Sequence, residues 1–313
     1  MKLLKDKTNI DFMGKRNIAL IFSSILIVAA LVTLPLKGLN LGLEFTGGTE
    51  VEVQFEAPPE VNEVRQALAD AGMDDVVVQT FGSSTQLLVR IPPGEDGSGS
   101  DDEATLVIEA LKVQYGEGVS MRGSGFVGSQ VGEELTEQGI LAVVYALIGI
   151  FIYVLFRFQW RFSVGAVMAV VHDILVSMGV LSLLQVSFDL TVVAALLAVV
   201  GYSLNDTIVL FDRIRENFPR LGKLAPREVI NRSVNQTLSR TLMTSLTTLL
   251  VLIALFIFGG EIIHAFAFTL IVGVIVGTYS SIYVASVSLL MLGVSKFDLM
   301  VVEKEGAQID TMP

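Results

Sequence analysis

Cysteine is missing from this 313-residue chain, and histidine occurs only twice. Without thiols no disulfide can brace the fold, and two histidines without an HExxH spacing argue against a zinc site. The phosphate-loop pattern GxxxxGK[ST] is also absent, which argues against nucleotide hydrolysis by this chain. We therefore expect no metal, no cofactor and no enzymatic activity of its own.

Charge is scarce as well, because Asp, Glu, Lys and Arg make up 17% of the residues while 52% are hydrophobic. The mean hydropathy of +0.66 is too high for an ordinary soluble protein of this length. Crossing a hydrocarbon core takes about 20 consecutive apolar residues in a helix. We predict a polytopic α-helical membrane protein with six transmembrane helices, at residues 18–36, 138–156, 162–184, 190–211, 241–258 and 262–292.

The first apolar run follows five cations in residues 1–17, as a signal peptide would. Its apolar part is longer than the usual signal core, and no small-x-small cleavage site follows it. An uncleaved anchor is therefore the favoured interpretation of this run.

The distribution of Lys and Arg predicts the orientation. If the N-terminus is cytoplasmic, the inside segments hold five, two, seven and two cations, in residues 1–17, 157–161, 212–240 and 293–313. The short loops near 185–189 and 259–263 hold none. We therefore predict both termini, and a basic loop at 212–240, on the cytoplasmic side, and residues 37–137 on the outer side.

The outer segment is acidic, with 5 Lys or Arg against 19 Asp or Glu, and no basic stripe with interleaved aromatic residues points to nucleic acid. Its pattern predicts, in order, a strand, a helix, two strands, a helix and a strand, near 51–55, 60–71, 76–79, 86–91, 103–115 and 118–122. This βαββαβ order is typical of a small α+β, ferredoxin-like domain. The fold hosts many functions, so it identifies none.

Glycine-rich segments at 38–49 and 123–139 flank this domain. Glycine permits positive φ and close backbone approach, so both segments suit tight connections to the domain. The second is either a hinge or an ordinary linker next to the membrane. The glycines singled out are Gly47, Gly48, Gly128 and Gly132.

The apolar run 190–211 contains an ionisable residue, Asp206. An Asp at the centre of a membrane helix costs roughly 2.5–3.5 kcal/mol, so such a residue is a functional hypothesis by default. Helical spacing stacks Tyr202 beside it, Asn205 adds a polar group at the same depth, and Thr207 follows. The two interpretations are a charge relay and an Asp that only snorkels to the cytoplasmic interface, which its short side chain does poorly.

Arg240 enters the fifth span at a depth comparable to that of Asp206, within a segment rich in Ser and Thr. The two could meet across the hairpin between the fourth and fifth spans, although anchoring at the cytoplasmic interface would also explain the arginine. A carboxyl whose surroundings alternate between water and a guanidinium can take up and release a proton. The hypothesis is that Asp206 carries the proton, Arg240 modulates it, and the 37–137 domain moves in response.

His172 and Asp173 lie midway in the third span and point about 100° apart on a helix. They are interpreted either as a polar brace inside the bundle or as a direct proton ligand. In the sixth span, Gly273 and Gly277 begin a stripe of small residues at spacing four, which predicts a close helix contact.

Two other functional classes compete with a proton relay. An intramembrane aspartyl protease would need two membrane carboxylates, but no GxGD-like sequence surrounds Asp173 or Asp206. A purely structural subunit, whose polar residues only hold the bundle together, stays open. Tolerance of neutral isosteres at Asp206 and Arg240 would favour the structural subunit.

Several motifs together resemble the SecF family of the resistance-nodulation-division group. They run over nearly the whole chain in the right order: Gly42-Leu-Glu-Phe-Thr-Gly-Gly48, Phe126-Val-Gly-Ser-Gln-Val-Gly-Glu-Glu-Leu135, Arg157-Phe-Gln-Trp160, His172-Asp173, Gly201-Tyr-Ser-Leu-Asn-Asp206 and Asp212-Arg-Ile-Arg-Glu-Asn217. Glu44 stands where the family usually has Asp, Ser129 where Pro is common, and Gln159 where Glu is common.

The resemblance implies a multi-pass subunit of the bacterial inner membrane that works with SecD beside the SecYEG channel, with YajC as a further candidate partner. It implies that the proton-motive force assists export of unfolded preproteins, with Asp206 and Arg240 at the positions of the family's proton-conducting aspartate and its arginine. Residues 37–137 would then be periplasmic. The alternative is a half-transporter for lipids or small molecules, although such exporters usually have larger outer domains and both repeats in one chain.

Overall fold

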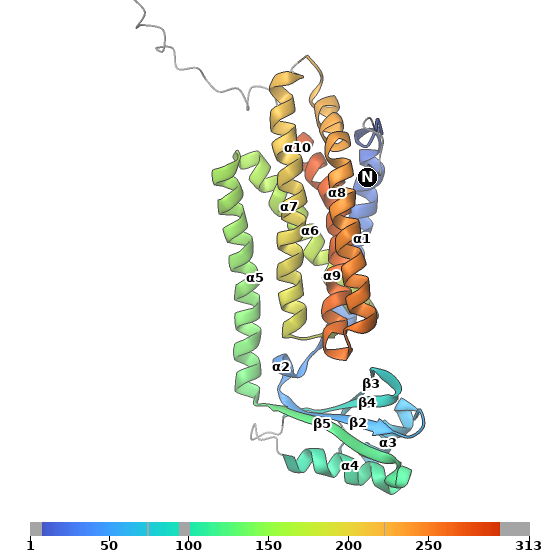
Figure 1. Ribbon diagram of the computed structural model, residues 1–313. Helices are drawn as coiled ribbons and strands as arrows, with labels where there is room; N and C mark the ends of the chain where they lie inside the picture. The colour runs from blue at the N-terminus through green and yellow to red at the C-terminus, as the bar shows by residue number, and fades with distance from the viewer. Residues whose placement is uncertain (1–7, 74, 94–100, 222, 295–313) are drawn as a thin grey trace, which may run out of the picture.

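The computed structural model describes residues 8–73, 75–93, 101–221 and 223–294, so most of the predicted C-terminal tail lies outside them. Six helical segments in this part are long and apolar enough to cross a membrane: Met13–Lys37, Ser129–Arg157, Trp160–Leu184, Leu190–Arg220, Pro226–Phe258 and Ile263–Met291. The prediction of six spans is confirmed. The segments form one elongated bundle with a small sheet domain at one end (Figure 1).

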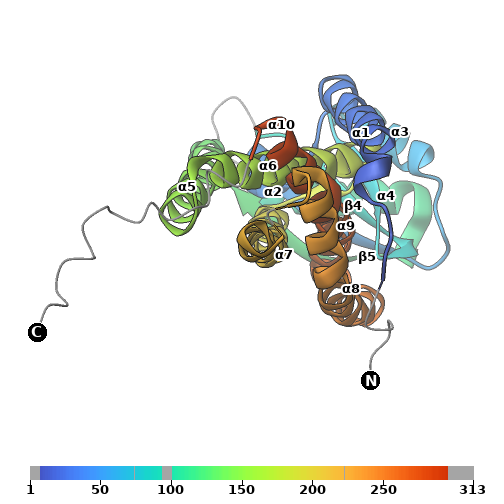
Figure 2. The same ribbon diagram turned by 90° about the horizontal axis from the view of Figure 1, so that it is seen from above.

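Three of the six spans form the interior of the bundle. Their elements are η1 Met13–Lys15 with α1 Arg16–Lys37, α5 Ser129–Arg157, α6 Trp160–Leu184, α7 Leu190–Arg220, α8 Pro226–Phe258, and finally α9 Glu261–Ser280, the π-helix η3 Ser281–Ala285 and α10 Ser286–Met291. In α6, α7 and the last span, 56%, 50% and 44% of the apolar window is buried, against only 6% in α5. Figure 2 accordingly shows α5 at one edge of the bundle.

The predicted basic loop at 212–240 is mostly helix. The fourth span continues to Arg220, and α8 begins at Pro226. The prediction was wrong because the charged residues lie on one face only, while Ile214 and Phe218 remain buried on the other. Proline at the first helical position, whose missing N–H would be unpaired anyway, then starts α8.

The predicted glycine linker at 123–139 is also largely regular structure, because β5 runs Val119–Val127 and α5 begins at Ser129. Gly123 and Gly125 lie opposite Glu52 and Glu50 in the ladder with β2. Their backbone groups are therefore held by the sheet. Only Gly128 stands between strand and helix, so the segment is not a flexible linker.

The sheet domain has the strand, helix, strand, strand, helix, strand order expected from its sequence. Its elements are β2 Gly48–Phe55, α3 Val61–Asp70, β3 Val77–Phe81, β4 Ser83–Ile91, α4 Asp101–Tyr115 and β5 Val119–Val127. The strands lie in the order β3-β4-β2-β5, and every pair is antiparallel. Alternate residues of β2, including Val51 and Val53, pack with Leu68 of α3 and Leu111 of α4 into a closed core.

A short junction that the sequence did not predict joins the sheet domain to the bundle. β1 Asn40–Leu41 pairs in parallel with β6 Ser187–Phe188, which connects α6 to α7. The one-turn helix α2 Leu43–Thr46 follows and lies against the start of α5. The chain therefore enters the sheet domain in contact with the α6–α7 connection.

Candidate functional site

Asp206 lies inside the bundle on α7, with 3% of its surface exposed. Its Oδ2 atom has no hydrogen-bond partner among the described residues. On α8, Arg240 lies close enough for its positive charge to act on this carboxyl, and Thr244 lies nearby. The burial disfavours snorkelling to the interface, which would leave the carboxylate in water.

Arg240 itself is exposed, and no direct ion pair joins it to Asp206 in the described part of the chain. The Thr244 hydroxyl donates to a backbone carbonyl one turn earlier on α8, either that of Arg240 at 3.1 Å or that of Thr241 at 2.9 Å. The α7–α8 hairpin thus brings the predicted pair together at electrostatic range.

The polar residues expected around Asp206 separate into inward and outward groups. Thr207 is fully buried, and its Oγ1 has no partner among the described residues. Tyr202 donates its hydroxyl to Ser245 of α8 at 3.2 Å, and Ser245 lies 2.7 Å from Thr278 of α9. Asn205 instead lies on the exposed face of α7, so it does not surround the buried carboxyl.

His172 and Asp173 form a second buried polar cluster. His172 Nδ1 lies 2.9 Å from Asp173 Oδ1, although the two residues start from different directions on α6. Asp173 Oδ2 accepts hydrogen bonds from Ser203 of α7 at 2.5 Å and from Ser280 of α9 at 2.6 Å. This cluster therefore ties three spans together, as a polar brace would.

The small residues of the last span lie against α7. A Cβ atom added to Gly273 would lie 2.0 Å from Val199 Cγ2, and one added to Gly277 would lie 3.2 Å from the Cβ of Ser203. The close helix contact is therefore within the chain. It brings Ser280 near enough to share Asp173 with Ser203.

The glycines that flank the sheet domain meet in space. Gly47 and Gly48 have φ values of +67° and +105°, a region that other residues rarely adopt. A Cβ on Gly48 would lie 2.1 Å from the Ile91 carbonyl oxygen, and one on Gly132 would lie 3.1 Å from the Gly47 nitrogen. Gly128 has open space around it. The two connections into the domain thus pack against each other.

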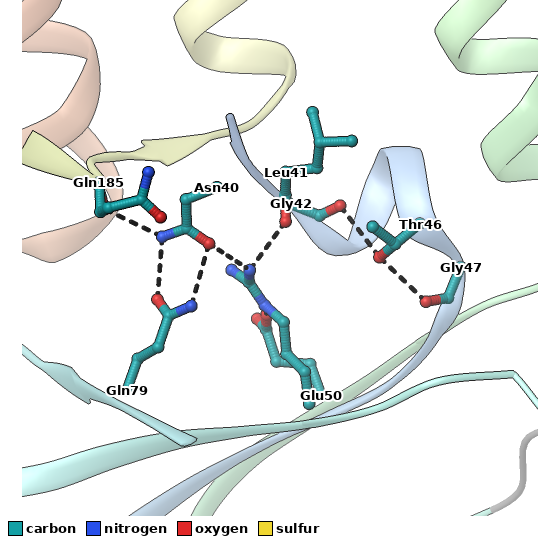
Figure 3. A network of polar contacts seen from close by, with 9 residues as sticks. Asn40, Leu41, Gly42, Thr46, Gly47, Glu50, Gln79 and Gln185 are labelled. Atoms are coloured by element: carbon teal, nitrogen blue, oxygen red, sulfur yellow. Dashed lines mark hydrogen bonds and ion pairs between the residues drawn. The ribbon is translucent and has the colours of Figure 1, made fainter. Parts of the chain in front are cut away.

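A polar network that the sequence did not predict links the domain to the α6–α7 connection; we call it the latch and define it as Asn40, Glu50, Gln79, Arg90 and Gln185. The Asn40 and Gln79 amides exchange two hydrogen bonds at 3.0 and 2.9 Å, and Asn40 also donates to the Gln185 carbonyl at 3.0 Å (Figure 3). Arg90 pairs with Glu50 at 2.6 Å and donates to the Leu41 carbonyl at 2.8 Å. Isolated Gln and Asn residues carry no sequence pattern that would have revealed it.

Among the described residues, no cluster of three or more His, Asp or Glu side chains could hold a metal ion. What the site offers chemically is two buried carboxyl groups, a histidine and hydroxyls that connect neighbouring helices. Such groups can hold and pass protons without a cofactor.

The comparisons with known proteins agree on one family. The family described as protein export membrane protein SecD/SecF, C-terminal, matches residues 107–295, and the SecD/SecF GG motif matches residues 32–59. Protein translocase subunit SecF of Vibrio alginolyticus is 53% identical over 100% of this chain and 99% of its own length. The subunit of the same name from Pseudomonas aeruginosa is 50% identical over 93% of this chain and 94% of its own.

Two solved structures resemble the fold. A crystal structure of SecDF, described as a translocon-associated membrane protein from Thermus thermophilus, has a TM-score of 0.84 and 38% identity over 93% of this chain. A structure of SecDF in a super-membrane-facing form has a TM-score of 0.68 at the same identity and coverage. In both cases the chain spans 39% of the length of the SecDF chain.

Proposed function

The chain belongs to the SecF family of the protein-export machinery, and on that premise we propose that it uses the proton-motive force to assist preprotein translocation beside the SecYEG channel, in a complex with SecD. It is a transport component rather than an enzyme, and its family relatives are translocase subunits. In this proposal Asp206 carries the proton and Arg240 modulates it. The sheet domain moves in response and assists the emerging chain.

The burial of Asp206 carries this proposal. A carboxyl group with 3% exposure and an unpaired oxygen is stable in a membrane bundle only if it is protonated or if a positive charge lies near it. Arg240 supplies that charge from the exposed side of α8, so its approach or withdrawal changes whether the carboxyl holds a proton. One charge crossing the membrane releases about 2.3 kcal/mol per 100 mV, enough to bias a domain movement.

The neighbouring groups support the relay in different ways. Tyr202 and Thr207 line the interior beside Asp206, and the pair His172 and Asp173 fixes α6 to α7 and α9. Asn205 lies on the exposed face of α7, so we propose that it contacts SecD and takes no part in proton transfer.

Movement would reach the sheet domain through its two connections. Gly47 and Gly48 enter it, Gly128 and Gly132 leave it, and the latch adds a third attachment at the α6–α7 connection. The difference in TM-score between the two SecDF structures, at equal identity and coverage, shows that their conformations differ over the region that matches this chain.

We place both termini in the cytoplasm and residues 37–137 in the periplasm of a bacterial inner membrane. The asymmetry of Lys and Arg between the two sides supports this orientation. The proposed partners are SecD, the SecYEG channel, YajC and the unfolded preprotein.

The test compares two substitutions of the same kind on one helix. Asp206→Asn removes the buried charge, whereas Asp212→Asn changes a partly exposed aspartate that pairs with Arg157 at 2.9 Å. In membrane vesicles containing SecD, we expect Asp206→Asn to lower export to the level seen without a proton gradient, and Asp212→Asn to export as the wild type does. Copurification with SecD confirms that both variants assemble. Normal proton-driven export by Asp206→Asn would leave the structural-subunit interpretation instead.

A further inference from the structure

The polar cluster around His172 contains more than a brace requires. His172 is 3% exposed and Asp173 is 1% exposed, and both lie in the middle of a span. The Asp173 carboxyl accepts hydrogen bonds on both oxygens, whereas His172 Nε2 is buried with no partner among the described residues. A histidine that served only to orient Asp173 would need one ring nitrogen, so the second one needs an explanation.

The hydrogen-bond distances assign the charge of Asp173. Ser203 and Ser280 reach its Oδ2 at 2.5 and 2.6 Å, which is the range of a hydroxyl that donates to an ionised carboxylate. A hydroxyl is the donor in each case, because a carboxylate can only accept. Two short hydroxyl contacts from α7 and α9 thus favour the ionised form of Asp173.

That assignment also fixes the histidine tautomer. Nδ1 lies 2.9 Å from an ionised carboxylate oxygen, so it carries a hydrogen and donates it. In neutral His172 the lone pair therefore lies on Nε2, the buried nitrogen without a partner. Adding a proton there turns the pair from a net charge of −1 to neutral, which lowers the cost of keeping it inside a membrane bundle.

Among the described groups around Asp173, His172 is the side chain that can carry a positive charge. Tyr279 of α9 lies beside the imidazole, with ring centroids 6.2 Å apart, and its hydroxyl contacts the Ala19 carbonyl and Ser23 of α1 at 2.8 and 3.0 Å. On α7, Asp206 follows Ser203 by one turn. In the described residues, His172 is the one basic side chain that pairs with Asp173.

We infer that His172 Nε2 is a second proton-accepting atom in this bundle, with Asp173 as its fixed counter-charge. It takes a proton from a hydronium ion, leaving water, to form an imidazolium paired with Asp173, and it releases that proton to water as hydronium. The inference deepens the proposed function and rests on it only for its role in transport. Through Ser203 and Ser280, the charge of the pair acts directly on α7 and α9.

Nitrogen-15 NMR tests the atom itself. His264→Gln leaves His172 as the one histidine of a chain that has two. The full-length variant, labelled with ¹⁵N-histidine in lipid nanodiscs, is followed from about pH 8 to about pH 5, where histidine changes its charge. We expect Nε2 to move from the resonance of an unprotonated nitrogen to that of a protonated one while Nδ1 stays protonated. An Nε2 that keeps either state throughout overturns the inference, because a brace does not titrate.

A second variant uses the counter-charge. Asp173→Asn removes the charge that stabilises the imidazolium, so we expect Nε2 to stay unprotonated over the same pH range. An unchanged transition would contradict the pairing. If this variant does not fold, the NMR result for the chain with intact Asp173 still decides the question.

The transport arm separates this inference from the proposed function. His172→Gln keeps an amide donor for Asp173 but cannot titrate, so we expect assembly with SecD to persist and the pH dependence of proton-driven export between about pH 5 and about pH 8 to differ from that of the wild type, with the contribution of Asp206 remaining. Wild-type export and pH dependence in His172→Gln would exclude the transport role. If Asp206→Asn exports normally, the proposed function fails whatever the spectrum shows. If Asp206→Asn stops proton-driven export but Nε2 does not titrate, the present inference fails alone.

Discussion

Replacing Gly273 by alanine tests the packing on which both buried clusters depend. The added Cβ would lie 2.0, 2.7 and 2.9 Å from Cγ2, Cγ1 and Cβ of Val199, so the side chain would collide with a whole isopropyl group. Val199 is fully buried. Either α9 moves away from α7 or the valine leaves its rotamer. Overpacking of this kind costs about 1–3 kcal/mol.

Combining Gly273→Ala with Val199→Ala should restore part of the lost stability. Val199→Ala alone removes two methyl groups and should cost roughly 1.6 kcal/mol plus a cavity term. In the double variant the new methyl occupies part of the space that the valine leaves, so the two changes should not add. We expect a favourable coupling of about 0.5–3 kcal/mol, as for residues in direct contact.

The assay is reversible unfolding of the full chain in detergent micelles, with Gly149→Ala as the matched control. Gly149 lies in the span α5, and a Cβ there would meet nothing within 4 Å. Its substitution should therefore be neutral or slightly stabilising, because alanine favours the helix. Equal stabilities for Gly273→Ala and Gly149→Ala, or additive effects in the double variant, would refute the close contact between α7 and α9.

Two further predictions concern the sheet domain. Arg90→Gln removes the ion pair with Glu50 and the hydrogen bond to the Leu41 backbone carbonyl, so the domain should take a wider range of positions. Spin labels can be attached to cysteines introduced at Val113 and Phe156, which are 89% and 87% exposed in a chain without native cysteine, and their distance distribution should broaden in this variant. Arg65→Gln, a control whose partner is the exposed Asn62, should leave the distribution unchanged. An unchanged distribution would mean that the latch does not hold the domain. Burial raises the pKa of Tyr115 above its ordinary value of 10.0, and the negative charges of Glu63 and Glu60 add to the effect. The stability that the phenolic proton contributes is therefore complete below pH 10.0, and it is lost as the pH rises through the higher pKa of the folded state. The Tyr115 hydroxyl is buried without a partner among the described residues, so Tyr115→Phe should be as stable as the wild type at neutral pH, or up to about 1–3 kcal/mol more stable. In unfolding measured from about pH 9 to about pH 11, Tyr115→Phe should lose less stability than the wild type. A steeper loss in Tyr115→Phe would contradict this account.

The arrangement of spans and strands could be predicted because it depends on local patterns. Runs of apolar residues give the six spans, and alternation gives β2 with Val51, Val53 and Phe55 inward. The ends of helices were harder to predict. α7 continues beyond its apolar run and α8 begins before its own, each with one buried face, and hydropathy averaged around a helix does not detect a single face.

The candidate site was predicted in part for the same reason. An aspartate in an apolar run is visible in the sequence, but the direction of its side chain depends on which face of α7 the neighbours cover. Asn205 and Asp206 are adjacent, yet the first lies outside and the second inside. The hydrogen bonds from Ser203 and Ser280 to Asp173 join residues 30 and 107 positions away, which no local pattern encodes.

The π-helix Ser281–Ala285 determines what the last span can seal. A π turn holds one residue more than an α turn, so everything after Ala285 is rotated by about 100° relative to an uninterrupted α-helix. Before the turn, Gly273 lies against α7; after it, Leu289 and Ser288 lie 3.4 and 3.7 Å from the position of a Cβ on Gly165 of α6. The last span thereby packs against α7 at Gly273 and against α6 after the π turn. Deleting a single residue from that turn would keep the contact of Gly273 with α7 and turn the residues after Ala285 away from Gly165 of α6.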